Sequence, residues 1–352
     1  MNTYIVTLYD INNPGSSLQA YALQKYINQN VEGVHSDIID YQPIYAKIGK
    51  NKLRGLLRRI LFYRNERKSD RKYKEFNEKY IGKTNVVHNI NEIKELPSVE
   101  VYIVGSDQLW NPDYDCGEDE VFWLSGICGK KISYATSVGK ILSEEESRRI
   151  ANRIKDFANI SVREESTTYG LSTSLSKEVA WVCDPVFLLD ADVYKSMCYD
   201  VKISSKYAVI YMTEKGELLD QIVSFMKAKG LIIVQMDGNR KRCDCDIHIK
   251  SIDPVDFLSW INSAEIVISS SFHATCFSII FQKKFAVVMP QNNSERIKSI
   301  LQLTNTDKRV IRNTDDIEKV LCESNYINSS NALGNHITDS KKYLTKALGE
   351  NI

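Results

Sequence analysis

The sequence predicts an α/β protein in which two units with open parallel sheets face each other across a central cleft. Short apolar segments rich in β-branched residues alternate with amphipathic helical segments in both halves of the chain. The length of 352 residues exceeds the usual size of a single core, which favours two domains. Sheets of this kind bind ligands beyond the carboxyl ends of their strands, so the cleft is the expected site.

The first half of the chain contains the elements of one such unit. Its expected strands are residues 4–9, 34–41, 101–104, 132–135 and 160–162. The first strand is followed by the turn Asn12–Gly15 and then by a helix through Leu18, Ala22 and Leu23. Strand, turn, helix and strand in this order begin a parallel sheet.

A second series of elements starts near Tyr207. Its expected strands are residues 208–212, 231–235, 266–269 and 286–289, and its expected helices are 218–229, 255–262 and 274–281. The segment 189–205 has no long periodic pattern and is the expected linker. We therefore predict an N-terminal α/β domain over 1–190, a C-terminal α/β domain over 206–335, and a final helix in 336–352 that packs back on the rest.

Composition narrows the class of protein. A net charge of +1 gives no general basic surface for nucleic acid. The eight cysteines are dispersed, which favours reduced thiols in the cytoplasm over a disulfide framework. Residues 1–9 already have the pattern of a strand without a basic leader, and no apolar run reaches the roughly 18 residues of a membrane span. We expect a cytoplasmic protein.

The segment Ile268–Thr275 is the strongest functional signal. An apolar strand runs into a turn of three serines, and His273 follows in the first turn of an amphipathic helix. Free N–H groups and the positive end of the helix dipole favour a phosphate or carboxylate there, beside an imidazole that can carry a proton. The alternative is that Ser271 only caps the helix and His273 is a satisfied core residue.

Two further segments place polar side chains after expected strands. Gly105–Pro112 presents a carboxylate, an amide and an indole, a combination suited to a carbohydrate, although a tight turn capped by Asp107 explains it equally well. Arg163 ends the strand at 160–162 and offers a fork for a carboxylate or phosphate. Its alternative role is an ion pair with Glu164 or Glu165.

Six strings in order resemble the polysaccharide pyruvyl transferase family. They are NPGSSLQAYALQ, GSDQLWNP, SYATSVG, SVREES, CDPVFLL and SSSFHATCFSIIFQKKF. The resemblance extends from about Asn13 to about Arg309. It implies a GT-B-like pair of Rossmann-type domains, with the acceptor on the N-terminal side and the donor on the C-terminal side. It also implies transfer of the enolpyruvyl group of phosphoenolpyruvate to a sugar, which yields a cyclic pyruvate ketal.

The same resemblance assigns Arg163 and His273 to the donor. Many members have an arginine two places before the histidine, where this chain has Ser271. Arg296 resembles a basic residue that recurs after the following strand, and it could restore part of the missing charge. The alternative for Arg296 is a solvated helix face.

A mechanism that fits these residue types needs fixed donors for two anionic groups, an acid and a base. The expected donor-binding residues are Arg163, Ser270, Ser271, Thr275 and Arg296. The expected acceptor-binding residues are Asn13, Gly15, Gln108, Trp110 and Asn111. His273 is the candidate general acid or phosphate-stabilising donor, and Asp107 or Glu164 is the candidate base. Phosphoenolpyruvate is a co-substrate in this scheme, and neither a cofactor nor a metal is expected.

Two other patterns suggest partners. Residues 47–74 are rich in lysine and arginine with a stripe of leucines, so they could contact the inner membrane surface near a lipid-linked sugar acceptor. The alternative is a helix packed on its own domain, and nucleic acid is not expected. Cys243, Cys245 and His248 could suggest zinc, but a single CxC pair favours an ordinary strand or hairpin with reduced thiols.

The sequence therefore predicts an enzyme that pyruvylates a hexose in the precursor of a cell-surface polysaccharide, such as a capsule or exopolysaccharide. Two alternatives stay open. A nucleotide-sugar glycosyltransferase could place a diphosphate at the same serine turn. A non-catalytic, sugar-binding component of a polysaccharide assembly complex would bind without turnover.

Overall fold

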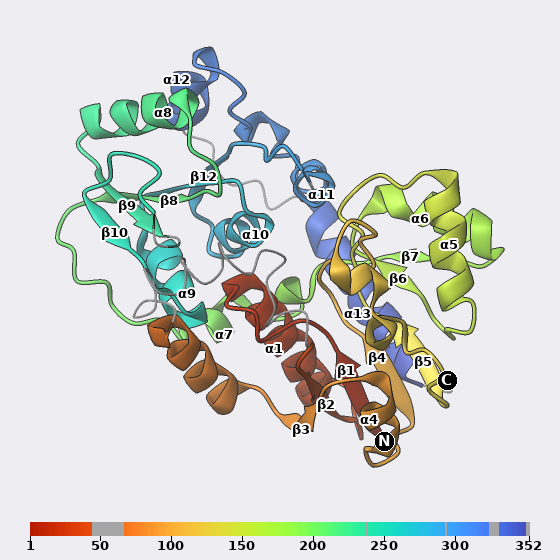
Figure 1. Ribbon diagram of the computed structural model, residues 1–352. Coiled ribbons are helices and arrows are strands. Elements are labelled where there is room, and N and C mark those ends of the chain that lie inside the picture. The colour runs from red at the N-terminus through yellow and green to blue at the C-terminus, as the bar shows by residue number, and fades with distance from the viewer. Residues whose placement is uncertain (44–66, 237, 239, 293, 324–330, 350–352) are drawn as a thin grey trace, which may run out of the picture.

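Two parallel sheets organise the protein. A computed structural model describes residues 1–43, 67–236, 238, 240–292, 294–323 and 331–349. Each half of the chain forms one five-stranded sheet. In Figure 1 the sheets occupy separate parts of the molecule, with α1 (Pro14–Asn30), α9 (Pro254–Ser263) and α10 (Phe272–Ile280) between them. The predicted α/β class is confirmed.

The N-terminal sheet has the strand order β3-β2-β1-β4-β5, and its neighbouring strands are parallel. Its strands are β1 (Asn2–Val6), β2 (His35–Tyr41), β3 (Lys83–Val87), β4 (Val101–Val104) and β5 (Lys130–Ser133). A bridge between Thr136 and Val162 links this sheet to a short parallel pair, β6 (Ser161–Val162) and β7 (Ala180–Trp181).

The helices of this unit begin at clear sequence signals. Asn13 caps α1 by accepting the N–H groups of Gly15 and Ser16, and Pro14 stands where no N–H is needed. Ser143 and Glu146 form a capping box at the start of α5. The other elements are α4 (Ile90–Glu95), η1 (Asp115–Glu118), η2 (Glu120–Trp123), α5 (Glu144–Ile154), α6 (Glu165–Leu175) and a helix over residues 67–80.

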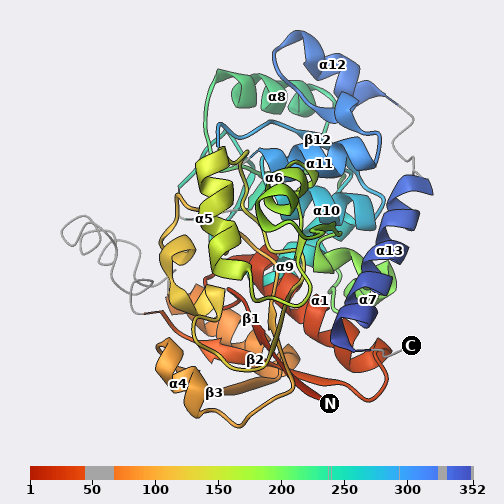
Figure 2. The same ribbon diagram turned by 90° about the vertical axis from the view of Figure 1, so that its right-hand side faces the viewer.

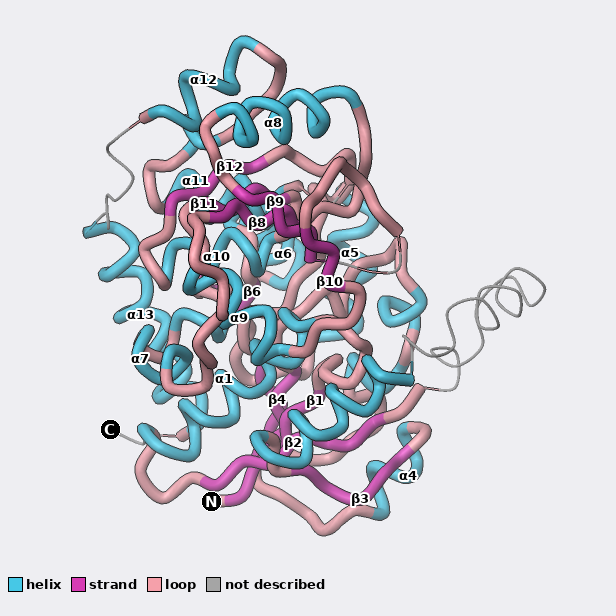
Figure 3. The backbone as a smooth tube through the Cα atoms, turned by 90° about the vertical axis from the view of Figure 1, so that its left-hand side faces the viewer, coloured by secondary structure: helices cyan, strands magenta, loops and turns pink. Residues whose placement is uncertain are grey.

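The C-terminal sheet has the order β10-β9-β8-β11-β12 and is also parallel. Its strands are β8 (Tyr207–Tyr211), β9 (Ile232–Met236), β10 (Ile247–Ile249), β11 (Ile266–Ser269) and β12 (Lys284–Val287). Its further helices are α8 (Glu217–Ala228), α11 (Glu295–Leu303), η4 (Asp307–Arg309) and α12 (Asp315–Cys322). Figure 3 shows α8 and α12 on one side of this sheet and α9 and α10 on the other.

The two sheets share one winding pattern. In each, the first strand lies in the centre, the next two lie to one side, and the last two lie to the other. The winding therefore reverses between β1 and β4 and again between β8 and β11. Such reversal points leave a crevice at the carboxyl ends of the strands. The loops after these four strands are accordingly the expected walls of a binding site.

The chain crosses between the units twice. The first connection contains η3 (Pro185–Phe187) and α7 (Ala191–Lys195). The second is α13 (Asn331–Leu348), which Figure 2 shows running from beside α11 past α7 to α1. In α13, Ser340 Oγ accepts the N–H of Cys183 at 2.8 Å and Tyr343 donates to the carbonyl of Ser133 at 3.0 Å. The helix packs back on the N-terminal unit, and it begins at residue 331 rather than 336.

The predicted basic segment 47–74 lies mostly outside the described residues, which resume at 67. Residues 67–74 belong to the helix over 67–80, where Tyr73 and Phe76 are buried. Lys72 in this helix forms an ion pair with Asp256 in α9. Within the described ranges, no helix combines the length and apolar character needed to cross a bilayer.

Three strands, β3, β7 and β10, were not predicted. β3 and β10 are edges of their sheets, and β7 is an edge of the short pair. β3 is largely polar and mostly solvent-accessible, and β10 has three half-buried residues. Edge strands bury less surface, so the apolar pattern that marks a central strand is weak there.

The packing of α13 on the first connection depends on Ser340, which is 1% exposed. We expect Ser340→Ala to destabilise the protein by about 1–3 kcal/mol, because the buried N–H of Cys183 loses its acceptor. Urea unfolding measures this change. Thr338→Ala, an exposed site on the same helix, is the matched control and should shift stability by less than about 0.5 kcal/mol. Equal effects of the two substitutions would contradict the interpretation.

Candidate active site

A cavity of about 370 Å³ lies where the loops of both reversal points meet. This volume is near the lower end of the ~300–1,000 Å³ typical of ligand pockets. The N-terminal unit contributes Asn13, Gln108 and Tyr114 to its wall. The C-terminal unit contributes Tyr211, Met212, Thr213, Glu214, Ser270, Ser271, Phe272, His273, Pro290, Asn292, Arg296 and Ile297. The site therefore draws on both halves of the chain.

The serine turn after β11 builds the start of α10. Ser271 is the N-cap, and its own N–H donates to Ser269 Oγ at 2.8 Å. Ser270 Oγ accepts the N–H of Thr213 at 3.2 Å, which ties the turn to the loop after β8. Thr275 Oγ donates to the carbonyl of Ser271 at 3.0 Å and does not line the cavity. Ser270 and Ser271 thus line the cavity, whereas Thr275 stabilises the helix.

His273 is the second residue of α10 and is 6% exposed. Its Nε2 lies 3.8 Å from Oδ2 of Asp184. No atom of the described residues is within hydrogen-bonding distance of this Nε2. His273 lines the cavity, and this ring nitrogen is buried without a partner in the described part of the chain.

Gly15 in the first turn of α1 lies directly against this imidazole. A Cβ added at Gly15 would overlap Nδ1 and Cγ of His273. The N-termini of α1 and α10 consequently meet at this point, and only a residue without a side chain allows the contact. Gly15 was predicted to contact the acceptor, but it does not line the cavity. Within this segment the cavity is lined by Asn13.

Asp184 is the carboxylate that joins the two units, and the sequence did not single it out as a site residue. Its Oδ2 accepts from Arg163 Nη1 at 2.5 Å and from Ser106 Oγ at 3.0 Å. Its Oδ1 accepts the N–H of Val186 at 3.1 Å, which caps η3. Burial alone would raise the pKa of Asp184, but Arg163 and His273 outweigh burial and hold it well below its usual range. Asp184 is therefore ionised at neutral pH.

Arg163 is enclosed in the wall behind the cavity, with 3% exposure. Burial lowers its pKa, but Asp184, Glu164 and Asp107 raise it, and the net shift is upward. Its Nε and Nη2 have no hydrogen-bond partner among the described residues. The structure thus brings Arg163 and His273 to the same oxygen of Asp184, but of the two only His273 lines the cavity.

Arg296 is the guanidinium that faces the cavity. It lies in α11, and its Nε is buried with no hydrogen-bond partner in the described part of the chain. The ring of Phe272 lies 4.5 Å from the Arg163 guanidinium carbon and 5.5 Å from that of Arg296. Burial and the nearby Arg163 lower the pKa of Arg296. Arg296 is thus not on a solvated helix face.

The two candidate bases are both held by hydrogen bonds behind the wall. Asp107 Oδ2 accepts from Ser16 Oγ at 2.5 Å, and Asp107 Oδ1 accepts the N–H of Gln108 at 2.8 Å. Burial raises the pKa of Asp107, but the charges of Arg163, His273 and Arg296 together lower it by more, so the net shift is downward. Glu164 accepts from the hydroxyl of Ser137 and is fully buried. These contacts suit charge compensation better than proton abstraction.

The loop after β4 places its residues differently from the prediction. Gln108 lines the cavity. Trp110 is fully buried, stacks on Trp123 at 5.5 Å and donates its indole N–H to the carbonyl of Phe122, so no ring face is left for a sugar. Asn111 is also fully buried. The loop turns sharply because Asp107 adopts a φ of +85°, which directs the indole into the core.

Tyr114 and Tyr211 are two tyrosines that line the cavity, one from each unit. Together with Thr213, Glu214 and Asn292 they form a polar, partly exposed portion of the wall. Sequence reasoning missed these residues. The position of Tyr211 at the carboxyl end of a buried strand was the available signal for one of them.

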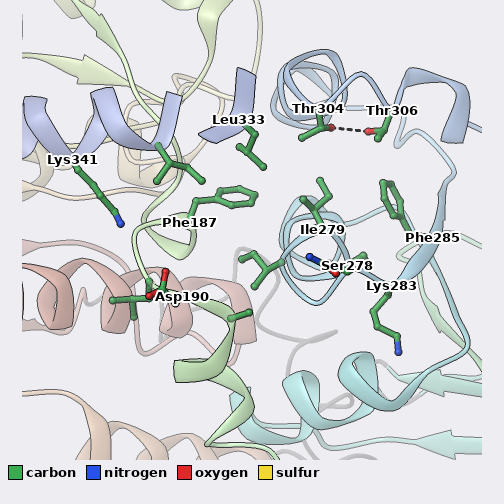
Figure 4. A pocket seen from close by; sticks show the side chains of 15 residues that line it. Phe187, Asp190, Ser278, Ile279, Lys283, Phe285, Thr304, Thr306, Leu333 and Lys341 are labelled. Carbon is green, nitrogen blue, oxygen red and sulfur yellow. Dashed lines mark hydrogen bonds between the residues drawn. The ribbon is translucent and has the colours of Figure 1, made fainter. Parts of the chain in front are cut away.

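Two other places considered for ligands differ from this site. The thiols of Cys243 and Cys245 each lie 3.8 Å from Oε1 of Gln235, and no metal-binding group of three ligands occurs among the described residues. A second cavity of about 230 Å³ lies between the C-terminal end of α10, the first connection and α13. Figure 4 shows Phe187, Ile279 and Leu333 around its middle, and no predicted site residue lines it.

A match to a family model identifies the family of this chain. The model of the family described as "Polysaccharide pyruvyl transferase" matches residues 13–292. The chain belongs to the polysaccharide pyruvyl transferase family. The matched range begins at Asn13, covers the loops after β4, β8 and β11, and includes Asp184 and His273 but not Arg296. No curated protein sequence matches the chain significantly.

Solved structures support the GT-B-like fold of this family member. The UDP-GlcNAc 2-epimerase of Methanocaldococcus jannaschii is 13% identical, with a TM-score of 0.57 and coverage of 99% of this chain and 100% of that one. The UDP-GlcNAc 2-epimerase of Neisseria meningitidis is 11% identical, with a TM-score of 0.54 and coverage of 99% of each chain. At these identities the similarity concerns the fold alone.

The contact between Gly15 and His273 can be tested by a double-mutant cycle. We expect Gly15→Ala to destabilise the protein by about 1–3 kcal/mol, because the added methyl overlaps the imidazole. The same change in a His273→Ala background should cost less, since most of the overlapping atoms are gone. Gly334→Ala, where a Cβ meets no atom within 4 Å, is the control. Equal costs in both backgrounds, measured by urea unfolding, would rule out the contact.

The buried carboxylate of Asp184 should make the free energy of unfolding depend on pH. Its folded pKa is depressed, so its contribution is present above the pKa of the unfolded state and is lost as pH falls toward the folded value. Asp184→Asn should cost on the order of 3 kcal/mol at neutral pH, because Arg163 loses its partner. The variant should then lose less stability than the wild type between neutral and acidic pH. Asp192→Asn, from the exposed pair with Lys195, is the control and should leave both quantities unchanged.

Proposed function

We propose that this family member transfers the pyruvyl group of phosphoenolpyruvate to a sugar of a cell-surface polysaccharide precursor, forming a pyruvate ketal. One observation carries the proposal. The first turn of α10 and Arg296 line the cavity, and His273 Nε2 and Arg296 Nε are buried polar atoms without partners in the described residues. Buried donors of this kind are costly unless a ligand satisfies them.

A phosphate suits this end of the cavity. The first N–H groups of α10 have no intrahelical acceptors, and the hydroxyls of Ser270 and Ser271 lie beside them. Arg296 supplies a guanidinium on the same wall. In this assignment Arg296 compensates for the serine at position 271, where many relatives have an arginine.

Two buried carboxylates, Asp184 and Asp107, interact electrostatically with His273. An imidazole can both donate and accept a proton, which is what general acid–base catalysis requires.

The reaction can then follow a balanced route. His273 gives its proton to the methylene carbon of phosphoenolpyruvate, which creates an oxocarbenium-like centre at the adjacent carbon. A sugar hydroxyl attacks this centre, and its proton passes to the imidazole. Loss of phosphate regenerates the electrophilic centre, a second hydroxyl closes the ketal ring, and its proton leaves with the phosphate. His273 thereby serves as acid and then as base, so neither Asp107 nor Glu164 is required to move a proton.

The acceptor is proposed to occupy the more exposed end of the cavity. Tyr114 and Tyr211 offer ring faces from the two units, and Asn13, Gln108 and Glu214 offer hydrogen-bonding groups. Aromatic rings with polar side chains are suited to a sugar. The modest volume of the cavity favours a compact donor with one sugar ring over a nucleotide sugar.

Ligand binding tests the donor assignment. We expect phosphoenolpyruvate to raise the Tm of the wild type, because a ligand that binds only the folded state stabilises it. His273→Ala and Arg296→Ala should each weaken this binding by roughly 10- to 100-fold, the effect of losing one charge-assisted hydrogen bond. Arg148→Ala, an exposed arginine on α5, is the matched control. A nucleotide-sugar panel measured in parallel tests the glycosyltransferase alternative, and stronger stabilisation by that panel would refute the donor assignment.

Turnover tests the reaction itself. Phosphate release should require both phosphoenolpyruvate and a sugar acceptor, and mass spectrometry of the sugar should show the added ketal. His273→Ala should abolish release while the fold is retained. A non-catalytic sugar-binding role predicts instead that the wild type binds sugar without releasing phosphate.

A further inference from the structure

The enclosure of Arg163 needs an explanation. Its guanidinium keeps one N–H on Asp184, while Nε and Nη2 have no partner among the described residues. The nearest carboxylate to Nε is Glu164, whose Oε1 is 3.9 Å away. Buried guanidinium N–H groups without acceptors are rare in folded proteins because each costs its full desolvation. The unpaired donors therefore indicate that the site is built to receive an acceptor.

The Phe272 side chain separates these donors from the cavity. Phe272 lines the cavity, whereas Arg163 does not, and the ring lies 4.5 Å from the Arg163 guanidinium carbon. The same ring lies 5.5 Å from the guanidinium carbon of Arg296. It is the first residue of α10 and is therefore placed where a ligand of the helix N-terminus must bind.

The Phe272 ring also lies near both guanidiniums. Two guanidiniums repel each other, and Arg163 contributes to the lowered pKa of Arg296. An aromatic ring near both cations offers each a weak cation–π attraction, which an anion would replace with stronger charge-assisted hydrogen bonds. Exchange of the ring for an anion is therefore favourable once a ligand is present.

We propose that Phe272 is a displaceable cover over Arg163: donor binding moves the ring aside, and Nε and Nη2 of Arg163 then donate to the donor's phosphate or carboxylate. Phe272 is a positioning residue in this scheme, and it makes the donor site respond to the presence of an anion. The identity of the donor rests on the proposed function, whereas the cover acts on any anion that reaches α10.

Calorimetric titration of inorganic phosphate and of phosphoenolpyruvate into four proteins tests this inference. They are the wild type, Phe272→Ala, Arg163→Lys and the double variant. Arg163→Lys keeps the charge and the pairing with Asp184 but removes the two unpaired N–H groups. We expect Phe272→Ala to bind both anions roughly tenfold more tightly, because the weak cation–π contacts no longer have to be broken. Arg163→Lys should weaken binding about tenfold and should cancel the gain in the double variant.

Controls keep the result interpretable. Phe225→Ala removes a ring that stacks under Lys229 far from the cavity, and it should leave both affinities unchanged. If Phe272→Ala fails to fold, Phe272→Leu should show a smaller gain that also depends on Arg163. The inference is wrong if Arg163→Lys leaves affinity unchanged in both backgrounds, or if loss of the ring weakens binding regardless of residue 163. The expected pattern with phosphate alone would support the cover and would count against the proposed donor.

Discussion

The buried carboxylate of Asp184 is the contact on which the rest of the site depends. A charge fully removed from water is tolerated only when it is paired and hydrogen-bonded, and Asp184 meets this requirement through Arg163, Ser106 and the N–H of Val186. Because it also approaches His273, the same oxygen contacts a basic side chain from each half of the chain. The chemistry of the cleft and the joining of the two units are therefore one arrangement.

The topology of the two sheets explains how Asp184, Arg163 and His273 come together. The two sheets wind in the same order, so the loops after their central strands converge. Helices α1 and α10 then meet at their N-termini, where Gly15 allows the imidazole to lie against the backbone. Their free N–H groups provide a region suited to an anion, which is the property that the proposed donor needs.

Many of the strands and the histidine of the site could be predicted from local sequence. Contacts between residues far apart in the chain could not. The strands β4 and β11 have the predicted bounds because buried β-branched runs end at small polar residues. His273 was identified because a strand, a turn and a helix follow one another without interruption. Trp110 was assigned to the acceptor, but its indole is buried in the core against Trp123 and donates to the carbonyl of Phe122. Asp184 could not be assigned, because its side-chain partners Arg163 and Ser106 are 21 and 78 residues away and meet it only in the folded chain.

The position of Asp184 on the segment that joins the units has a consequence for timing. Any hinge rotation that opened the cleft would move the Asp184 carboxylate away from the His273 imidazole of the opposite unit, so the imidazole would act as the proton source only when the two units are closed. In the proposed reaction this would protect phosphoenolpyruvate from hydrolysis, because an open molecule could bind the donor but could not activate it.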